Sequence, residues 1–398
     1  MTGVTEHYDS FPYPERDPED EAKRLVTGSP SHPLEIDHFL FAGKRDWAQR
    51  FRVLVAGAGT GDAVVQMAQV LTSAGKPYEI TYLDLSAKAR KIAEARMVAR
   101  GLSNVEFVTG DILEAPRLGP FDYIDCSGVL NHMVDPRDGL KALADAVTDT
   151  GGIGLTVHAN LGRPGVASLQ SAFAKLLHGS PRERLRRAKA IVQRLPENHP
   201  FKRNPSLVEH AGTDAGLFDL LLPARDRTFS IRDLVEALDM CGLTIVGQPQ
   251  AHLYDPTPLV GDAALVRDMA PLERMELAEQ LSGVIRTHIA YVAKSTDGRA
   301  ARLDREAVPH LKGISGPMLS QKAAEKGVIP VSHSGAVAEI PVSAMAVRAL
   351  SFVDGRHNLA QIARAAELEP VAFTSIWRPL SDALTTYGLM FYSRLLAG

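Results

Sequence analysis

Short apolar segments alternate with helical patterns between residues 51 and 160. The apolar segments are rich in β-branched residues and end at glycine or polar positions, which is typical of strands: "RVLVAG", "YEITYLDLS", "VEFVTGD", "FDYIDCSG" and "GGIGLTVHAN". Between the first three, "AVVQMAQVLTSAG" and "AKARKIAEARMVARG" have helical spacing and end in glycine. Strands that alternate with helices of this length predict right-handed βαβ units and a parallel sheet covered on both faces.

The pattern changes after residue 160. Residues 161–225 and 256–286 are expected to form helical insertions, and "GLTIVGQ" and "THIAYVAKS" two further strands. After residue 296, the order helix, turn, helix, helix and short strand predicts a small winged-helix-like module. We therefore expect an N-terminal segment over 1–40, an α/β domain over 41–296 and an accessory C-terminal domain over 297–398.

Charge and composition narrow the function classes. The chain of 398 residues has a net charge of −3, which gives no electrostatic argument for nucleic acid or a membrane surface. The C-terminal module is nearly neutral, which argues against DNA binding. No apolar run approaches the length of about 18 residues that a membrane span needs, and no signal peptide is visible. Cys126 and Cys241 have no metal-ligand or redox spacing, so we expect a cytoplasmic protein without a metal site.

The turn "AGAGTGD" joins the first strand to the first helix. Gly57, Gly59 and Gly61 let the backbone turn tightly and approach a ligand, and the helix N-terminus offers unpaired N–H groups. An ordinary strand–helix connection is the alternative. A dinucleotide fingerprint has a third glycine at the sixth position, where this chain has Asp62. Because a carboxylate repels a pyrophosphate, a cofactor without phosphate fits this turn better.

Acidic residues follow the next two strands. Asp84 is placed to bind both hydroxyls of a ribose. Asp111 is placed to accept from an adenine amino group while Ile112 packs on the ring. Each acid taken alone is equally well explained as a helix N-cap. Their order at successive strand ends favours a nucleoside-type ligand.

With these motifs in order, residues 50–160 resemble the class I S-adenosylmethionine-dependent methyltransferases. The resemblance implies a seven-stranded Rossmann-like sheet whose last strand is antiparallel, with S-adenosyl-L-methionine across the carboxyl ends of the first four strands. The cofactor contacts that we expect on this basis are Gly57, Ala58, Gly59, Gly61, Asp62, Asp84, Leu85, Asp111, Ile112 and Ser127. One departure is Val55, where the family often has an acid, so the methionine amino group needs another partner.

Blocks outside this region resemble a bacterial subgroup that carries a regulatory region behind the methyltransferase core. The blocks are "YDSFPYP", "RRAKAIVQRLPEN", "GLFDLLLPARDRTFSIRDLVEALDMCGLTIVGQ" and "VDGRHNLAQIA". That subgroup includes the protein-lysine methyltransferases of Rickettsia-like bacteria. The resemblance is one of layout and short blocks.

The candidate catalytic residues are Asn131, His132, His158 and Tyr13. Asn131 either orients an acceptor amine or caps a helix, and His132 is either a base or hydrogen-bond donor or a loop histidine. His158 is expected to face the site, or else to be structural. Tyr8 and Tyr13 lie among prolines, and Tyr8 is a predicted cofactor contact. We expect the two tyrosines either to close over the cofactor as a lid or to hold the segment on the protein surface without a role in binding.

Two further features bear on the methyl acceptor. Three acids precede the helix before the sixth strand: Asp214, Asp219 and Asp226. They are expected either to attract a cationic acceptor such as a lysine side chain or to be solvated or capping residues. The basic stretch Arg182–Arg203 meets an acidic protein or RNA, or is the exposed face of a helix. The leading hypothesis is N-methylation of a protein, on lysine. The alternatives are a small-molecule methyltransferase of secondary metabolism and a cofactor-sensing binding module, and the sequence leaves a homodimer open.

Overall fold

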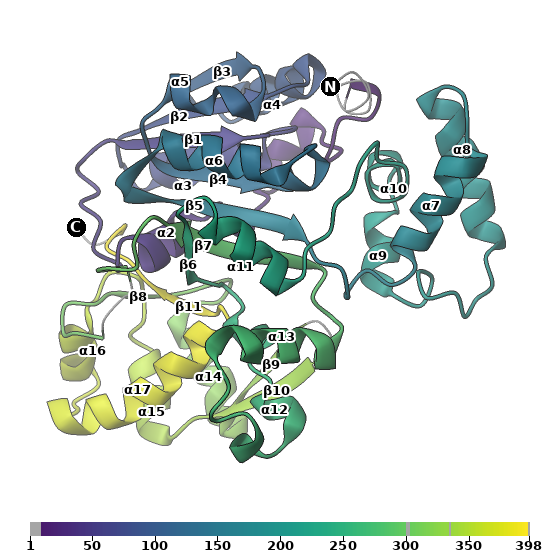
Figure 1. The fold of residues 1–398 in the computed structure, drawn as a ribbon. Coiled ribbons are helices and arrows are strands. Elements are labelled where there is room, and N and C mark those ends of the chain that lie inside the picture. Colours follow the sequence, from purple (N-terminus) through teal and green to yellow (C-terminus); the bar gives the residue numbers. More distant parts are fainter. Residues whose placement is uncertain (1–8, 300–302, 334–335, 397–398) are drawn as a thin grey trace.

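The computed structural model describes residues 9–299, 303–333 and 336–396 (Figure 1). Its largest element is a seven-stranded sheet in the order β3-β2-β1-β4-β5-β7-β6. The strands are β1 (Phe51–Ala56), β2 (Tyr78–Asp84), β3 (Val105–Thr109), β4 (Phe121–Ser127), β5 (Val147–His158), β6 (Thr244–Gly247) and β7 (Thr287–Ala293). The first five are parallel, and β7 runs antiparallel to β5 and β6. The predicted sheet is confirmed, and β5 begins at Val147 rather than at Gly151.

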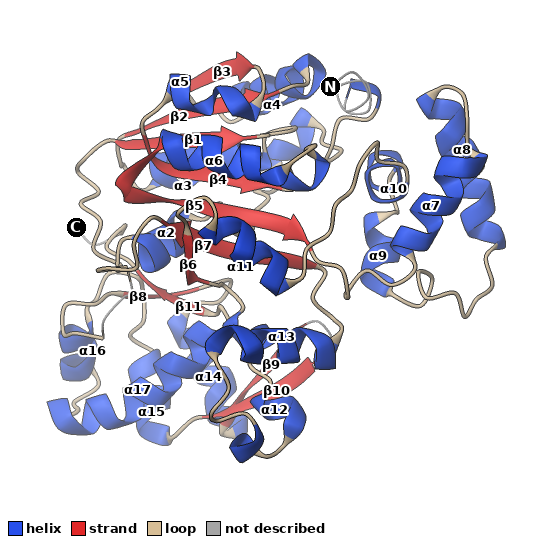
Figure 2. Ribbon diagram, in the orientation of Figure 1, coloured by secondary structure: helices blue, strands red, loops and turns tan. Residues whose placement is uncertain are grey.

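Alternating side chains of the buried strands point to opposite faces of the sheet, and helices cover both faces (Figure 2). On the face of Leu54 the covering helices include α6 (Pro136–Ala146) and α11 (Ile231–Asp239). On the face of Val53 they are α2 (Pro33–Leu40), α3 (Asp62–Ser73) and α4 (Ala87–Ala99). Short helices occupy connections: η1 (Pro18–Ala22), η2 (Ile112–Glu114), α5 (Ala115–Leu118) and η3 (Leu130–His132).

Residues 161–225 form a helical lobe beside the carboxyl end of β5 (Figure 1). Its helices are α7 (Val166–Leu176), α8 (Pro181–Arg194), α9 (Pro205–His210) and α10 (Asp214–Leu221). The lobe has an apolar core of its own around Phe173, Phe201 and Phe218. It therefore stands as a separately packed body next to the edge where the predicted site lies.

The predicted second insertion, residues 256–286, contains α12 (Thr257–Val260), η5 (Ala263–Leu265) and α13 (Pro271–Ser282), and η4 (Ala251–Tyr254) lies just before it. The C-terminal region contains the predicted helix–helix–helix–strand order as α15 (Ala344–Leu350), α16 (Leu359–Ala365), α17 (Pro370–Thr386) and β11 (Met390–Tyr392). It also contains β8 (Pro309–Leu311), α14 (Gly316–Lys326) and the hairpin of β9 (Val328–His333) and β10 (Ala336–Pro341), which the sequence pattern did not predict. The domain limits given above remain predictions.

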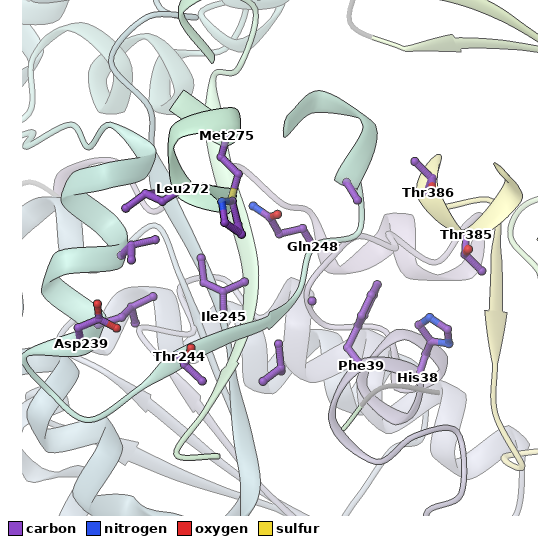
Figure 3. A pocket seen from close by; sticks show the side chains of 16 residues that line it. His38, Phe39, Asp239, Thr244, Ile245, Gln248, Leu272, Met275, Thr385 and Thr386 are labelled. Atoms are coloured by element: carbon purple, nitrogen blue, oxygen red, sulfur yellow. The ribbon is translucent and has the colours of Figure 1, made fainter. Parts of the chain in front are cut away.

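A cavity of about 560 Å³ lies between β6, α11, α13 and the end of α17 (Figure 3). Its lining includes His38, Phe39, Ile245, Met275 and Thr386. It contains none of the predicted site residues, because β6 is the edge strand farthest from β3. Within the described ranges, no helix has both the length and the apolar character that a membrane crossing requires.

Candidate active site

The glycine turn adopts a backbone that other residues rarely adopt. Gly57, Gly59 and Gly61 have φ values of 73°, 52° and 97°. A Cβ at Gly57 would lie 2.1 Å from a methyl group of Val129, and one at Gly59 would lie 2.6 Å from the carbonyl oxygen of Tyr13. The loop after β4 and the N-terminal segment thus pack directly on the turn, and side chains at these glycines would displace them.

Asp84 stands at the carboxyl end of β2, beside the glycine turn. Its carboxylate accepts the N–H groups of Gly59 and Ser86, each at 2.8 Å. Burial raises its pKa. A carboxylate has about four acceptor positions, so two remain for the hydroxyl groups of a ribose. The side chain therefore ties the turn to β2 and has the acceptor capacity that the predicted ribose contact needs.

The predicted contacts at the next strand ends are also at the carboxyl edge. Asp111 accepts the N–H of Leu113 at 3.0 Å, so it is the N-cap of η2, the structural alternative considered for it. Ile112 is buried beside it. Ser127, at the end of β4, is exposed and donates to the buried Asp125 at 2.9 Å.

The N-terminal segment lies on the glycine turn. The Thr60 hydroxyl donates to the carbonyl of Pro14 at 2.7 Å, and Arg16 donates to both carboxylate oxygens of Asp62 at 2.8 and 2.6 Å. Asp62 also accepts from Arg96 at 2.7 Å. Burial acts to raise the pKa of Asp62, but the two arginines hold it below its usual value. Asp62, predicted as a cofactor contact, is thus the anchor of this segment.

A second anchor lies a few residues later. Glu21, whose side chain is 4% exposed, accepts from Arg96 at 2.5 Å and also pairs with Arg100. Arg96 is itself only 1% exposed and donates to the carbonyl of Thr60 as well. Glu21 is therefore fixed to α4 by buried charge pairs, whereas Arg16 is fixed to Asp62 of α3 by a partly exposed one. Tyr8, the other predicted lid residue, lies outside the described residues.

On the acceptor side, His158 and Asp226 form a buried hydrogen-bonded pair. Nδ1 of His158 lies 2.7 Å from Asp226, whose other oxygen lies 2.9 Å from Arg163 and 2.8 Å from Gln170. Burial acts to raise the pKa of Asp226, but His158 and Arg163 hold it well below its usual value. Because the carboxylate only accepts, Nδ1 carries the proton and Nε2 has the lone pair. Burial lowers the pKa of His158, so the ring is neutral at pH 7.

Asn131 and His132 hold the backbone around this pair. The Asn131 amide donates to the carbonyl of Arg227 and accepts the N–H of His158 at 3.2 Å. His132 lies 2.6 Å from the carbonyl of Arg225 and edge-on to the His158 ring at 6.0 Å. Asn131 is fully buried, so its contacts fit a positioning role better than the predicted contact with an acceptor.

The lobe adds a second polar group to this edge. The hydroxyl of Tyr13 lies 3.3 Å from Nε2 of His210, and that nitrogen lies 3.6 Å from the buried carboxylate of Asp219. Burial acts to raise the pKa of Asp219, but His210 holds it below its usual value. The ring of Phe11 packs on Phe218 at 4.6 Å. The N-terminal segment therefore contacts the glycine turn and the lobe together.

The three predicted acids have different positions. Asp219, on α10, and Asp226, in the loop that pairs with His158, have buried side chains, so the solvated alternative does not hold for them. Asp214 is exposed and pairs with Lys189 on the outside of the lobe. Reasoning from sequence missed Arg163, Gln170 and His210, because nothing in their spacing relates them to the strand ends.

Comparison with known proteins supports this geometry. The family model described as a methyltransferase domain matches residues 54–153, which include the glycine turn and both strand-end acids. An uncharacterized protein of Synechococcus sp. is 26% identical over 323 residues, covering 78% of this chain and 76% of that one. Demethylmenaquinone methyltransferase of Geobacillus stearothermophilus is 33% identical over 96 residues, covering 24% of this chain and 39% of its own.

Among solved structures, PKMT2 from Rickettsia typhi in complex with AdoHcy is similar over most of the chain. The TM-score is 0.65 at 13% identity, with 93% of this chain and 77% of that chain covered. At this identity the likeness concerns the fold. Together with the matched domain, it defines the chain as a class I S-adenosylmethionine-dependent methyltransferase.

The residues at the strand ends fit S-adenosylmethionine. Asp84 has acceptor capacity for a ribose, and the half-buried Leu85 follows it with an apolar side chain. Arg16 and Arg96, which lie at the turn, are both paired with Asp62, and this carboxylate disfavours a pyrophosphate there. In the described part of the chain, no three His, Cys, Asp or Glu side chains are arranged to hold a metal ion.

Proposed function

We propose that the enzyme transfers the methyl group to an amine of a protein, the side chain of lysine. The observation that carries this proposal is the pair of buried carboxylates, Asp219 and Asp226, on the acceptor side of the strand ends. Ionised carboxylates in a partly dehydrated site attract a cation such as a lysine ammonium group. The fold likeness to PKMT2, a protein-lysine methyltransferase, agrees with this acceptor.

The same site contains a group that accepts the proton that the amine must lose. S-adenosylmethionine, when bound, supplies a methyl group that is already activated. Nε2 of His158 is the lone-pair nitrogen of a neutral ring, held in that tautomer by Asp226. It takes the ammonium proton, and the amine nitrogen then forms its bond to carbon as the bond from sulfur to carbon breaks. Asn131 fixes the backbone of His158, which holds the imidazole at the strand end.

A small-molecule acceptor is the second candidate. The observation that favours it is the N-terminal segment, which contacts both the turn and the lobe through Tyr13 and so narrows access to the site. Demethylmenaquinone methyltransferase, a relative over a quarter of the chain, carries the name of a small-molecule enzyme. This segment would have to open before a protein side chain enters.

The experiment that distinguishes the two candidate acceptors measures which cell fraction receives the labelled methyl group. Cell lysate is incubated with the enzyme and radiolabelled S-adenosylmethionine, and protein, nucleic acid and metabolite fractions are counted separately. We expect label in protein, released as methyl-lysine on acid hydrolysis. Label confined to metabolites would reject the protein acceptor and establish the second candidate.

A matched pair of variants tests the role of the buried carboxylates. Asp219→Asn removes a buried charge but keeps a hydrogen-bond acceptor for His210, and we expect KM for a cationic acceptor to rise roughly tenfold or more. Asp214→Asn removes an exposed charge from the same helix, and we expect no change. Cofactor affinity should stay the same in both. Equal effects of the two variants would contradict the proposal.

A further inference from the structure

The charge of the protein is unevenly distributed. The helical lobe, residues 161–225, has eleven Lys and Arg residues and five Asp and Glu residues, a net charge of +6 in a chain whose net charge is −3. The rest of the chain is therefore strongly negative. Because the lobe is a separately packed body beside the candidate site, this charge lies on one distinct part of the molecule (Figure 1).

Part of the lobe's positive charge is used inside the lobe. Arg163 pairs with Asp226 at the site, and the guanidinium of Arg184 lies over the ring of Phe218 at 5.6 Å. Lys189 pairs with Asp214, as described above. Lys202 likewise pairs with Glu197 at 2.8 Å. These contacts account for four of the eleven cations of the lobe.

Several other arginines of the lobe have no such role. They are exposed and form no ion pair with a carboxylate in the described ranges: Arg182, Arg186, Arg187, Arg194 and Arg203. All but the last lie on α8, whose buried face is made by Leu185 and Ala188. Arg182 and Arg186 are four residues apart, a spacing at which like charges destabilise a helix. Arg187 and Arg194 each donate to a backbone carbonyl of the lobe, those of His178 and Ala190. Exposed arginines that lack a carboxylate partner and lie together on one helix face favour an external acidic partner.

We propose that the outer face of α8, defined by Arg182, Arg186, Arg187 and Arg194, docks an acidic segment of the protein acceptor. This inference rests on the proposed function. The lobe has cations on its outer face, and the buried carboxylates of Asp219, within the lobe, and Asp226, directly after it, lie on the side of His158. The acceptor that matches both surfaces has a target lysine within reach of an acidic stretch. RNA matches only the outer face, since it brings no ammonium group to the buried carboxylates.

The test uses the full-length enzyme and three triple variants. Arg182→Glu with Arg186→Glu and Arg187→Glu reverses the charge of the docking face. The same substitutions to Lys keep it. Reversal of three exposed arginines elsewhere is the matched control: Arg305→Glu, Arg364→Glu and Arg378→Glu. Each variant is assayed with lysate protein at low and high salt, with poly-L-glutamate, RNA or anionic vesicles as competitors.

We expect the Glu variant on α8 to lower the rate of protein labelling at low salt by about tenfold or more, with unchanged cofactor affinity. High salt should remove most of the difference, because it screens exposed charges. The Lys variant and the C-terminal control should behave like the wild type. Poly-L-glutamate should compete with the wild type and not with the Glu variant, and labelled proteins should be acidic on isoelectric focusing.

The outcomes separate this inference from the proposed function. Protein labelling that is equal in the Glu variant and the C-terminal control would overturn the docking face and leave the protein acceptor in place. Stronger competition by RNA or by vesicles than by poly-L-glutamate at equal charge would assign the face to that other partner and overturn the inference. Absence of protein label in the wild type would overturn both proposals.

Discussion

The buried charge cluster around Glu21 allows a quantitative test of how the N-terminal segment is held. Glu21→Gln keeps the size of the side chain and removes its charge, which leaves Arg96 and Arg100 without this partner. Removal of one partner from a buried ion pair costs about 3–5 kcal/mol. Arg96 keeps Asp62 and the carbonyl of Thr60, so we expect a loss near the lower end, about 3 kcal/mol.

The assay is urea unfolding at pH 7, combined with hydrogen exchange of the amides in η1. The matched control is Asp20→Asn on the same short helix, because Asp20 pairs with Lys23 at the exposed surface. We expect no measurable loss from this control. If Glu21→Gln and Asp20→Asn have the same stability and the same exchange rates, the segment is not held by the buried cluster and the reasoning is wrong.

Three further predictions concern single side chains. Asp84→Ala should weaken S-adenosylmethionine binding by about 1–3 kcal/mol in calorimetry, and an unchanged affinity would leave Asp84 only its bonds to the glycine turn. Burial raises the pKa of Asp125 to about 6. The folded protein therefore keeps a proton on this carboxyl that the unfolded chain loses near pH 4. The stability that this protonated carboxyl contributes is lost as pH rises through 6. Asp125→Asn should therefore be more stable than wild type at pH 8, by up to about 3 kcal/mol, and not at pH 4, whereas parallel stability curves would refute the shift. His158→Gln should lower kcat about a hundredfold and remove the acidic limb of the pH–rate profile, while loss of kcat with the limb intact would exclude His158 as the proton acceptor.

The positions of the glycine turn and of the strand-end acids were largely predictable because they depend on local sequence. A glycine turn consists of consecutive residues, so the sequence shows it directly. A strand that ends in a polar residue places Asp84 at the carboxyl edge of the sheet, independently of the loop conformations. The sheet order followed from strands and helices that alternate along the chain. These features depend on periodicity and on rules of connection that hold across many folds.

The acceptor side was not predictable in the same way. The partner of His158 is Asp226, whose own partners are Arg163 and Gln170, and only the packing of the lobe brings these side chains together. Asp62 stands where a cofactor contact was expected, but Arg16 reaches it from 46 positions earlier in the chain. A single sequence has no periodic signal for such long-range pairs. The aromatic residues of the N-terminal segment indicated that it docks, and the surface that receives it became visible only in the fold.

The path of the N-terminal segment has a consequence for the order of events in turnover. Residues 11–16 touch the glycine turn through Thr60 and the lobe through Phe218 and His210. We therefore expect release of the spent cofactor to require movement of this segment away from the turn, and entry of an acceptor beneath the lobe to require its movement away from the lobe. Because one short segment makes both contacts, we expect the enzyme to exchange its cofactor and its acceptor in linked steps rather than independently.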